Sequence, residues 1–93
     1  MRAALHSESS NLSTECGLDL GDPTLWRDTG DATVSGLSGQ AAFDAIADAV
    51  STRMESGPVL SLGGDHSVSW PAIAAHASRH PGLAVLHLSL IHI

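Results

Sequence analysis

Pro58-Val59-Leu60-Ser61-Leu62-Gly63-Gly64-Asp65-His66-Ser67 is the stretch that decides the fold. Residues 58–62 are almost entirely apolar, and the run ends in two glycines followed by an Asp-His-Ser triplet. A short continuous apolar run of this kind is typical of a parallel strand that is buried on both faces. Open α/β folds bind their ligands at the carboxyl ends of such strands. The stretch therefore predicts a buried strand that delivers His66 to one edge of a sheet.

The segment before this strand has helical periodicity from Gln40 to about Met54. Asp44 and Asp48 lie between the apolar positions and are expected to face water. Ser38 is a candidate N-cap, and Gly57-Pro58 is a strong stop signal. The apolar positions that form one stripe at spacings of three and four are Phe43, Ile46, Val50 and Met54.

The segment after the strand predicts a second helix from about Trp70 to His80. Ser69 is its candidate N-cap, and Pro71 falls in its first turn, where proline is tolerated. Leu83–Leu86 is a second short apolar run, and a third is centred on Leu18–Leu20. Strands that alternate with helices predict parallel β-α-β units. The fold class is therefore α/β, a three-layer α/β/α sandwich with a parallel sheet.

Composition limits the possible functions. The formal net charge is −6, with four arginines and no lysine, so the chain lacks the basic surface that nucleic-acid binding requires. No apolar run reaches the length of a membrane span, and no signal peptide is evident. Cys16 is the single cysteine, which excludes an intramolecular disulfide and fits a reducing compartment. We interpret Cys16 as a buried small residue and expect a cytoplasmic protein without nucleic-acid or membrane partners.

Three segments carry a family resemblance. Gly63-Gly64-Asp65-His66-Ser67 resembles the signature of the ureohydrolases, the manganese enzymes that include arginase and agmatinase. Leu18–Asp22 is similar to that family's early Asp-x-Gly-Asp strand, and Ala84–His87 resembles the opening of its Val-Leu-His-Phe-Asp-Ala-His-x-Asp strand. The resemblance implies an arginase-like fold, with residues 1–87 as a partial ureohydrolase domain.

The same resemblance implies a site. His66 corresponds to the family's first manganese ligand, and imidazole suits Mn²⁺ as one ligand among carboxylates. Gly63 and Gly64 would shape the turn, Asp65 would orient either His66 or the loop, and Ser67 belongs to the same turn. In the intact family enzyme two manganese ions serve the hydrolysis of a small guanidinium substrate to urea and an amine. We expect that intact enzyme to be a homo-oligomer.

The remaining metal ligands of the family are missing. The family's next three ligand positions fall on Ser89, Ile91 and Ile93, and His92 is one residue out of register. A slip of one residue turns a strand side chain to the opposite face of the sheet. One ligand, His66, therefore remains of the binuclear set, and we expect this chain by itself to be inactive.

Residues 88–93 are expected to be non-native. Leu-Ser-Leu-Ile-His-Ile can be encoded by a nucleotide sequence that resembles a transposase-end adapter used in sequencing libraries, and such additions do not contribute to a fold. The alternative is a natural apolar C-terminal strand. The family has an earlier strand and helix before the segment that begins at Arg2. Met1 is therefore expected to be an internal start or the edge of a fragment, so the chain is read as truncated at both ends.

Substrate and function remain open among alternatives. The run Ser67-Val68-Ser69-Trp70-Pro71 resembles agmatinase-like members, which favours agmatine over arginine. One alternative is a non-catalytic interaction fragment that pairs through open strand edges. Another is a weak mononuclear metal binder at His66. His76 and His80 also have a metal-binding spacing, but nearby Arg79 disfavours a cation, and a solvated helix face is the preferred interpretation.

Overall fold

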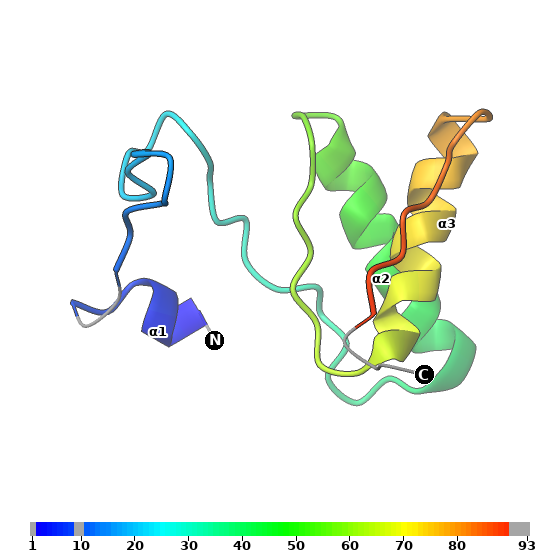
Figure 1. Ribbon diagram of the computed structural model, residues 1–93. Helices are drawn as coiled ribbons and strands as arrows, with labels where there is room; N and C mark the ends of the chain where they lie inside the picture. Colours follow the sequence, from blue (N-terminus) through cyan, green and yellow to red (C-terminus); the bar gives the residue numbers. More distant parts are fainter. Residues whose placement is uncertain (1, 9–10, 90–93) are drawn as a thin grey trace. The chain divides into compact units, whose positions relative to one another are not determined.

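The computed structural model describes residues 2–8 and 11–89, and the chain divides into two compact units, Met1–Gly30 and Asp31–Ile93. The first unit contains the short helix α1 (Arg2–Leu5) (Figure 1). The second contains α2 (Gly39–Met54), the 3₁₀ helix η1 (His66–Val68) and α3 (Ser69–Arg79). The last four residues of the predicted adapter-derived tail, 90–93, lie outside the described residues, as does the predicted start at Met1.

Helix α2 confirms the helix that the apolar stripe predicts. Val50 is buried, Phe43 and Ile46 are half-buried, and Asp44 and Asp48 are exposed. Ser38 occupies the N-cap position with an extended backbone, but its side chain makes no capping hydrogen bond. The stability of α2 therefore comes from burial of its apolar face rather than from its cap.

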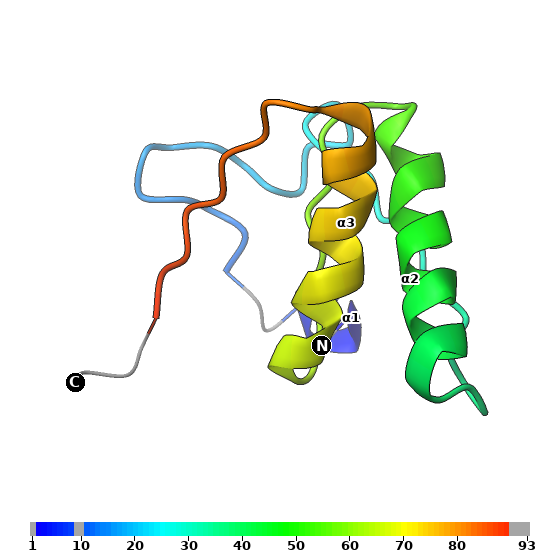
Figure 2. The same cartoon turned by 90° about the vertical axis from the view of Figure 1, so that its right-hand side faces the viewer.

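Helix α3 confirms the second predicted helix, with a correction at its start. Ser69 is the first helical residue and Val68 holds the N-cap position, because η1 leads directly into α3 and leaves no extended residue there to act as a cap. Pro71 and Ala75 are buried on the face that contacts α2. The two helices lie side by side and run in the same direction (Figure 2).

The predicted parallel sheet is absent among the residues that the structure describes. Residues 58–63 and 83–89 form no strands, although both are extended and run opposite to the helices (Figure 1). Leu60 is 87% exposed and Leu86 is 85% exposed. A strand exists only where a neighbouring chain segment pairs with its backbone groups, and continuous apolar runs also need cover on both faces. Within residues 31–89 the helices form the one layer that is described, so this part of the chain contains the helices of the α/β class but not its sheet.

The first unit holds a small antiparallel pairing in place of the predicted strand at Leu18–Leu20. Ser13 and Asp19 form an isolated bridge, and the Leu20 amide donates to the Leu12 carbonyl at 2.8 Å. Gly17 has a φ of 86°, a left-handed conformation that favours glycine, at the turn between the paired residues. Cys16, in the same turn, is exposed, so its interpretation as a buried residue is wrong.

No helix in the described part of the chain is both long and apolar enough to cross a membrane. α2, at 16 residues, carries exposed carboxylates along one face, as a surface helix does.

Candidate functional site at the start of α3

The turn that precedes α3 is crowded at one of its two glycines. A Cβ on Gly63 would collide with the Cγ2 methyl of Val68 and would lie 3.4 Å from the Val68 Cβ. Gly64 has nothing within 4 Å of the corresponding position, and its φ is not in the left-handed region. The close approach between the turn and η1 therefore requires glycine at position 63 alone.

Asp65 caps η1 and fixes the backbone next to His66. Its Oδ1 accepts a hydrogen bond from the Ser67 amide at 2.8 Å and another from the Ser67 hydroxyl. The Ser67 hydroxyl, the Ser67 amide and the nearby His66 all lower the pKa of the Asp65 carboxyl, in that order of importance. Asp65 and Ser67 thus hold the turn through local hydrogen bonds of the kind that N-cap side chains make.

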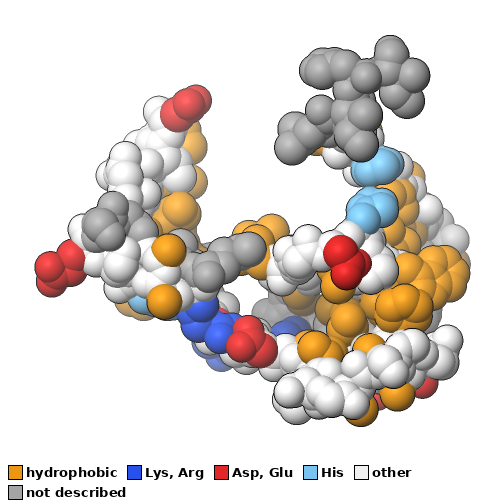
Figure 3. Space-filling model, turned by 90° about the horizontal axis from the view of Figure 1, so that it is seen from below, with side chains coloured by type: hydrophobic (Ala, Val, Ile, Leu, Met, Phe, Trp, Pro, Cys, Tyr) orange, Lys and Arg blue, Asp and Glu red, His pale blue; other side chains and the backbone are white. Residues whose placement is uncertain are grey.

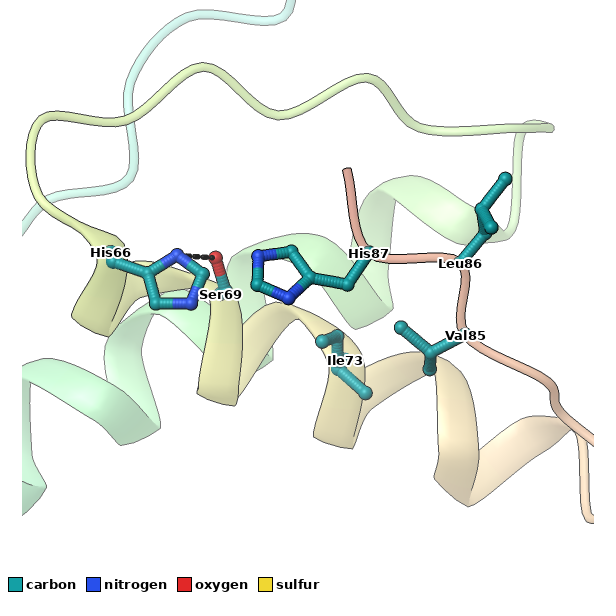
Figure 4. A pocket seen from close by; sticks show the side chains of 6 residues that line it. All are labelled: His66, Ser69, Ile73, Val85, Leu86 and His87. Atoms are coloured by element: carbon teal, nitrogen blue, oxygen red, sulfur yellow. Dashed lines mark hydrogen bonds between the residues drawn. The ribbon is translucent and has the colours of Figure 1, made fainter. Parts of the chain in front are cut away.

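His66 is the first residue of η1, and its exposed imidazole faces the second extended segment. The Ser69 Oγ lies 3.5 Å from His66 Nδ1. The imidazole of His87 is stacked against that of His66, with ring centroids 5.3 Å apart and ring planes inclined by 21°. Figure 4 shows the two rings facing each other, with the Ser69 hydroxyl beside His66.

These side chains line an open pocket of about 310 Å³. Ile73 of α3 and Val85 form its apolar side, and the side chain of Leu86 points away from the imidazoles (Figure 4). On the face shown in Figure 3, histidine side chains lie beside exposed hydrophobic ones. The pocket therefore combines a polar end with an apolar wall.

The described residues do not fit a binuclear manganese site. Across residues 2–8 and 11–89, no group of three or more His, Cys, Asp or Glu side chains converges. Asp65, the carboxylate nearest in sequence to His66, is turned toward Ser67. Mn²⁺ prefers several oxygen ligands, and the pocket offers imidazoles and one hydroxyl instead. Two of the predicted absent-ligand positions, 91 and 93, lie outside the described residues.

Sequence reasoning placed His66, Asp65 and Ser67 together, but of the residues that line the pocket it assigned only His66 to a site, and it missed the polar neighbours Ser69 and His87. Ser69 was assigned to a helix cap, and His87 was interpreted as a strand residue. The signal for His87 was present, because residues that end two parallel segments meet at the same edge of the fold. His87 follows the second apolar run, just as His66 follows the first.

Comparison with known proteins gives the family. The arginase family model matches residues 1–89. Arginase 1, mitochondrial, of Oryza sativa subsp. indica is 35% identical over 95% of this chain and 28% of its own length. The agmatinase of Bacillus anthracis is 39% identical over 66% of this chain and 21% of its own length. The agmatinase of Bacillus subtilis (strain 168) is 36% identical over 74% of this chain and 24% of its own length.

The chain spans less than a third of the length of these relatives. No solved structure matched it. The family match includes the Gly-Gly-Asp-His-Ser turn, the two helices around it and the second extended segment through Ser89. The match over nearly the whole chain confirms the family resemblance that the Gly-Gly-Asp-His-Ser motif indicated, and this polypeptide belongs to the arginase family.

Proposed function

We propose that this chain is part of a manganese-dependent ureohydrolase, which hydrolyses a small guanidinium substrate to urea and an amine. The observation that carries the proposal is the position of the Gly-Gly-Asp-His-Ser turn. It presents His66 from the start of α3 into a pocket, next to the end of the second extended segment. The family match over residues 1–89 supports the same reaction class.

His66 is proposed as one manganese ligand of the intact enzyme. Ser69 and His87 lie against its ring, so they restrict the ring's orientation, and metal-ligating imidazoles are commonly oriented by a second group. Asp65 and Ser67 fix the backbone of the turn, and Gly63 allows it to approach Val68. The described residues supply no further converging ligand set, so the chain by itself is proposed to be inactive.

Agmatine is the favoured substrate and arginine the next. The Ser67–Pro71 run supports agmatine, and relatives named agmatinase and arginase both match the chain. We propose a homo-oligomeric, cytoplasmic parent enzyme. The rice relative is named as mitochondrial, so the compartment needs its own measurement in cells.

The test begins with the source locus, sequenced through the codon of His87. Continuation into Phe-Asp-Ala-His-x-Asp would supply the missing ligands and identify residues 88–93 as foreign. The protein from that longer frame is then incubated with Mn²⁺ and either agmatine or arginine, and the urea released is measured. We expect urea from agmatine, a large loss of activity in His66→Ala, and none from the 93-residue chain. Turnover of arginine alone would contradict the substrate preference, and turnover by the 93-residue chain would contradict its inactivity.

A further inference from the structure

A second pocket lies at the far end of α3 and shares no residue with the first. Its volume is about 460 Å³, and one histidine of α3, the histidine that caps the C-terminus of α3 and the last residue of α2 contribute to its lining. None of the Gly63–Ser67 turn takes part. The lining residues are Met54, Gly57, Pro58, Val59, His76 and His80.

His76 and His80 are placed to act together. His80 is the C-cap of α3, and its amide donates a hydrogen bond to the His76 carbonyl at 3.0 Å, so the last turn of the helix places the two residues on the same side. A spacing of four residues is that by which two histidines of one helix hold a zinc ion in known metal sites. His76 is half-buried and His80 is exposed, so the pair stands at the boundary between pocket and solvent.

The hydrogen bond of His76 fixes its tautomer. His76 Nδ1 lies 2.8 Å from the carbonyl oxygen of Ala72. A carbonyl oxygen can only accept, so Nδ1 carries the proton and donates, which leaves the lone pair on Nε2. A ring held in this way by a backbone carbonyl is the common arrangement for a metal-ligating histidine. The lone pair of His76 Nε2 is therefore available to bind a cation.

The positive charge of Arg79 is directed away from the pair. Its Nη2 lies 3.4 Å from Glu55 Oε1 and 3.2 Å from Ser51 Oγ, both on the α2 side. From the sequence alone, the nearby positive charge of Arg79 disfavours a cation here. The ion pair with Glu55 compensates part of that charge, so the repulsion of a cation is weaker than the sequence suggests. The site also lies at the C-terminal end of α3, where the helix dipole favours positive charge.

We propose that His76 and His80, with the thioether of Met54 as a third donor, bind one late first-row transition-metal ion. Copper is preferred to zinc, and both are preferred to Mn²⁺, because imidazole and thioether are soft or borderline ligands and affinity rises along the series toward Cu²⁺. This site uses no residue of the proposed manganese site, so a test of metal binding here does not depend on the proposed function.

The test uses the full 93-residue chain and the metal chlorides alone. Zn²⁺ and Mn²⁺ are titrated by calorimetry, and Cu²⁺ is added in substoichiometric amounts while the histidine ring signals are followed by NMR. We expect Cu²⁺ to broaden the signals of His76 and His80 first, and Zn²⁺ to raise the thermal midpoint of helix loss. Heat from Mn²⁺ equal to that from Zn²⁺ would overturn the proposal.

Two matched variants separate this site from the other. His80→Gln and His66→Gln remove an exposed imidazole by the same substitution. His80→Gln is expected to weaken Zn²⁺ binding about tenfold or more, since loss of a group that merely orients a ligand already costs that much. His66→Gln should leave binding unchanged. The reverse pattern would overturn the proposal and assign metal uptake to the first pocket.

A third variant tests the thioether. Met54→Leu keeps the size and apolar character of the side chain and removes the sulfur, so the helix pair should fold as before. The preference for copper over zinc is expected to fall, while the two imidazoles still bind both ions. An unchanged copper preference would overturn the role of Met54. Circular dichroism of each variant, compared with the parent chain, provides the folding control.

Discussion

His66 and His87 stack their imidazole rings with centroids 5.3 Å apart, although His66 begins η1 and His87 lies in the second extended segment of the chain. His66 follows residues 58–63, and His87 lies within residues 83–89. The contact brings the ends of these two segments together without any strand ladder between them. The two side chains therefore lie together, as the ends of neighbouring parallel strands would, but residues 58–63 and 83–89 do not pair through their backbones.

Removing the His87 ring should change the NMR spectrum of His66. A stacked aromatic ring shields the protons that face it, so His87→Ala is expected to move the His66 ring protons downfield. His87→Phe keeps a ring at this position and should preserve most of the shielding. The measurement is a carbon–proton correlation spectrum of the aromatic region. Identical His66 shifts in the parent chain and in His87→Ala would show that the stack is not formed in solution.

Gly63 and Gly64 should respond differently to the same substitution. Gly63→Ala forces a methyl group against Val68 and is expected to lower the free energy of unfolding by about 1–3 kcal/mol, the usual cost of overpacking. Gly64→Ala meets no neighbour and should change that free energy by less than about 1 kcal/mol, toward stability because alanine restricts the unfolded chain. Urea denaturation of both variants measures the difference. Equal effects would contradict the close approach of Gly63 to Val68.

The sequence predicted both long helices correctly, but the predicted strands are not formed among the described residues. The difference has a physical reason. A helix satisfies its backbone hydrogen bonds internally, so the stripe through Phe43, Ile46 and Val50 contains enough information to predict α2. A strand depends on partners elsewhere, so the apolar run at 59–62 predicts a strand only if those partners are present. Likewise, the hydrogen bonds of Asp65 join residues two apart in the sequence, whereas the stacking of His87 on His66 depends on how distant segments meet.

Two valine truncations should report on where the core lies. Val50 of α2 is 6% exposed and Val85 is 58% exposed. Val50→Ala is expected to lower the free energy of unfolding by about 1.5–2.5 kcal/mol, because it removes buried methyl groups and leaves a cavity. Val85→Ala removes the same atoms from a solvated position and should cost less than about 1 kcal/mol. Thermal and urea denaturation both measure the difference, and a larger loss for Val85→Ala would contradict the packing of α2 against α3.

Asp28 should make the first unit sensitive to acid. The Gly30 amide, His6 and Arg2 lower the pKa of its carboxyl from 3.8 to about 2. A lowered pKa in the folded state means that the carboxylate stabilises the fold above pH 3.8 and that this stabilisation is lost as the pH falls through about 2. His6 stacks on Trp26, with ring centroids 6.1 Å apart, so Trp26 fluorescence reports the change.

The acid titration is best made in a Trp70→Phe background, where Trp26 is the single tryptophan. The fluorescence of this chain should change as the pH falls through the range in which the Asp28 carboxylate is protonated. Asp28→Asn cannot form the carboxylate, so its fluorescence should be nearly constant over that range. A transition of equal size in both chains would show that another group is responsible.

Cys16 should be more reactive than an ordinary surface thiol. Its Sγ lies 3.2 Å from the Thr14 hydroxyl, which lowers the pKa of the thiol, and the side chain is exposed. Alkylation proceeds through the thiolate, so its rate should rise at a lower pH than for a cysteine without such a partner. Thr14→Val keeps the shape of the side chain and removes the hydroxyl, and it should move the pH–rate profile of iodoacetamide labelling upward in pH. Profiles that coincide would show that Thr14 does not stabilise the thiolate.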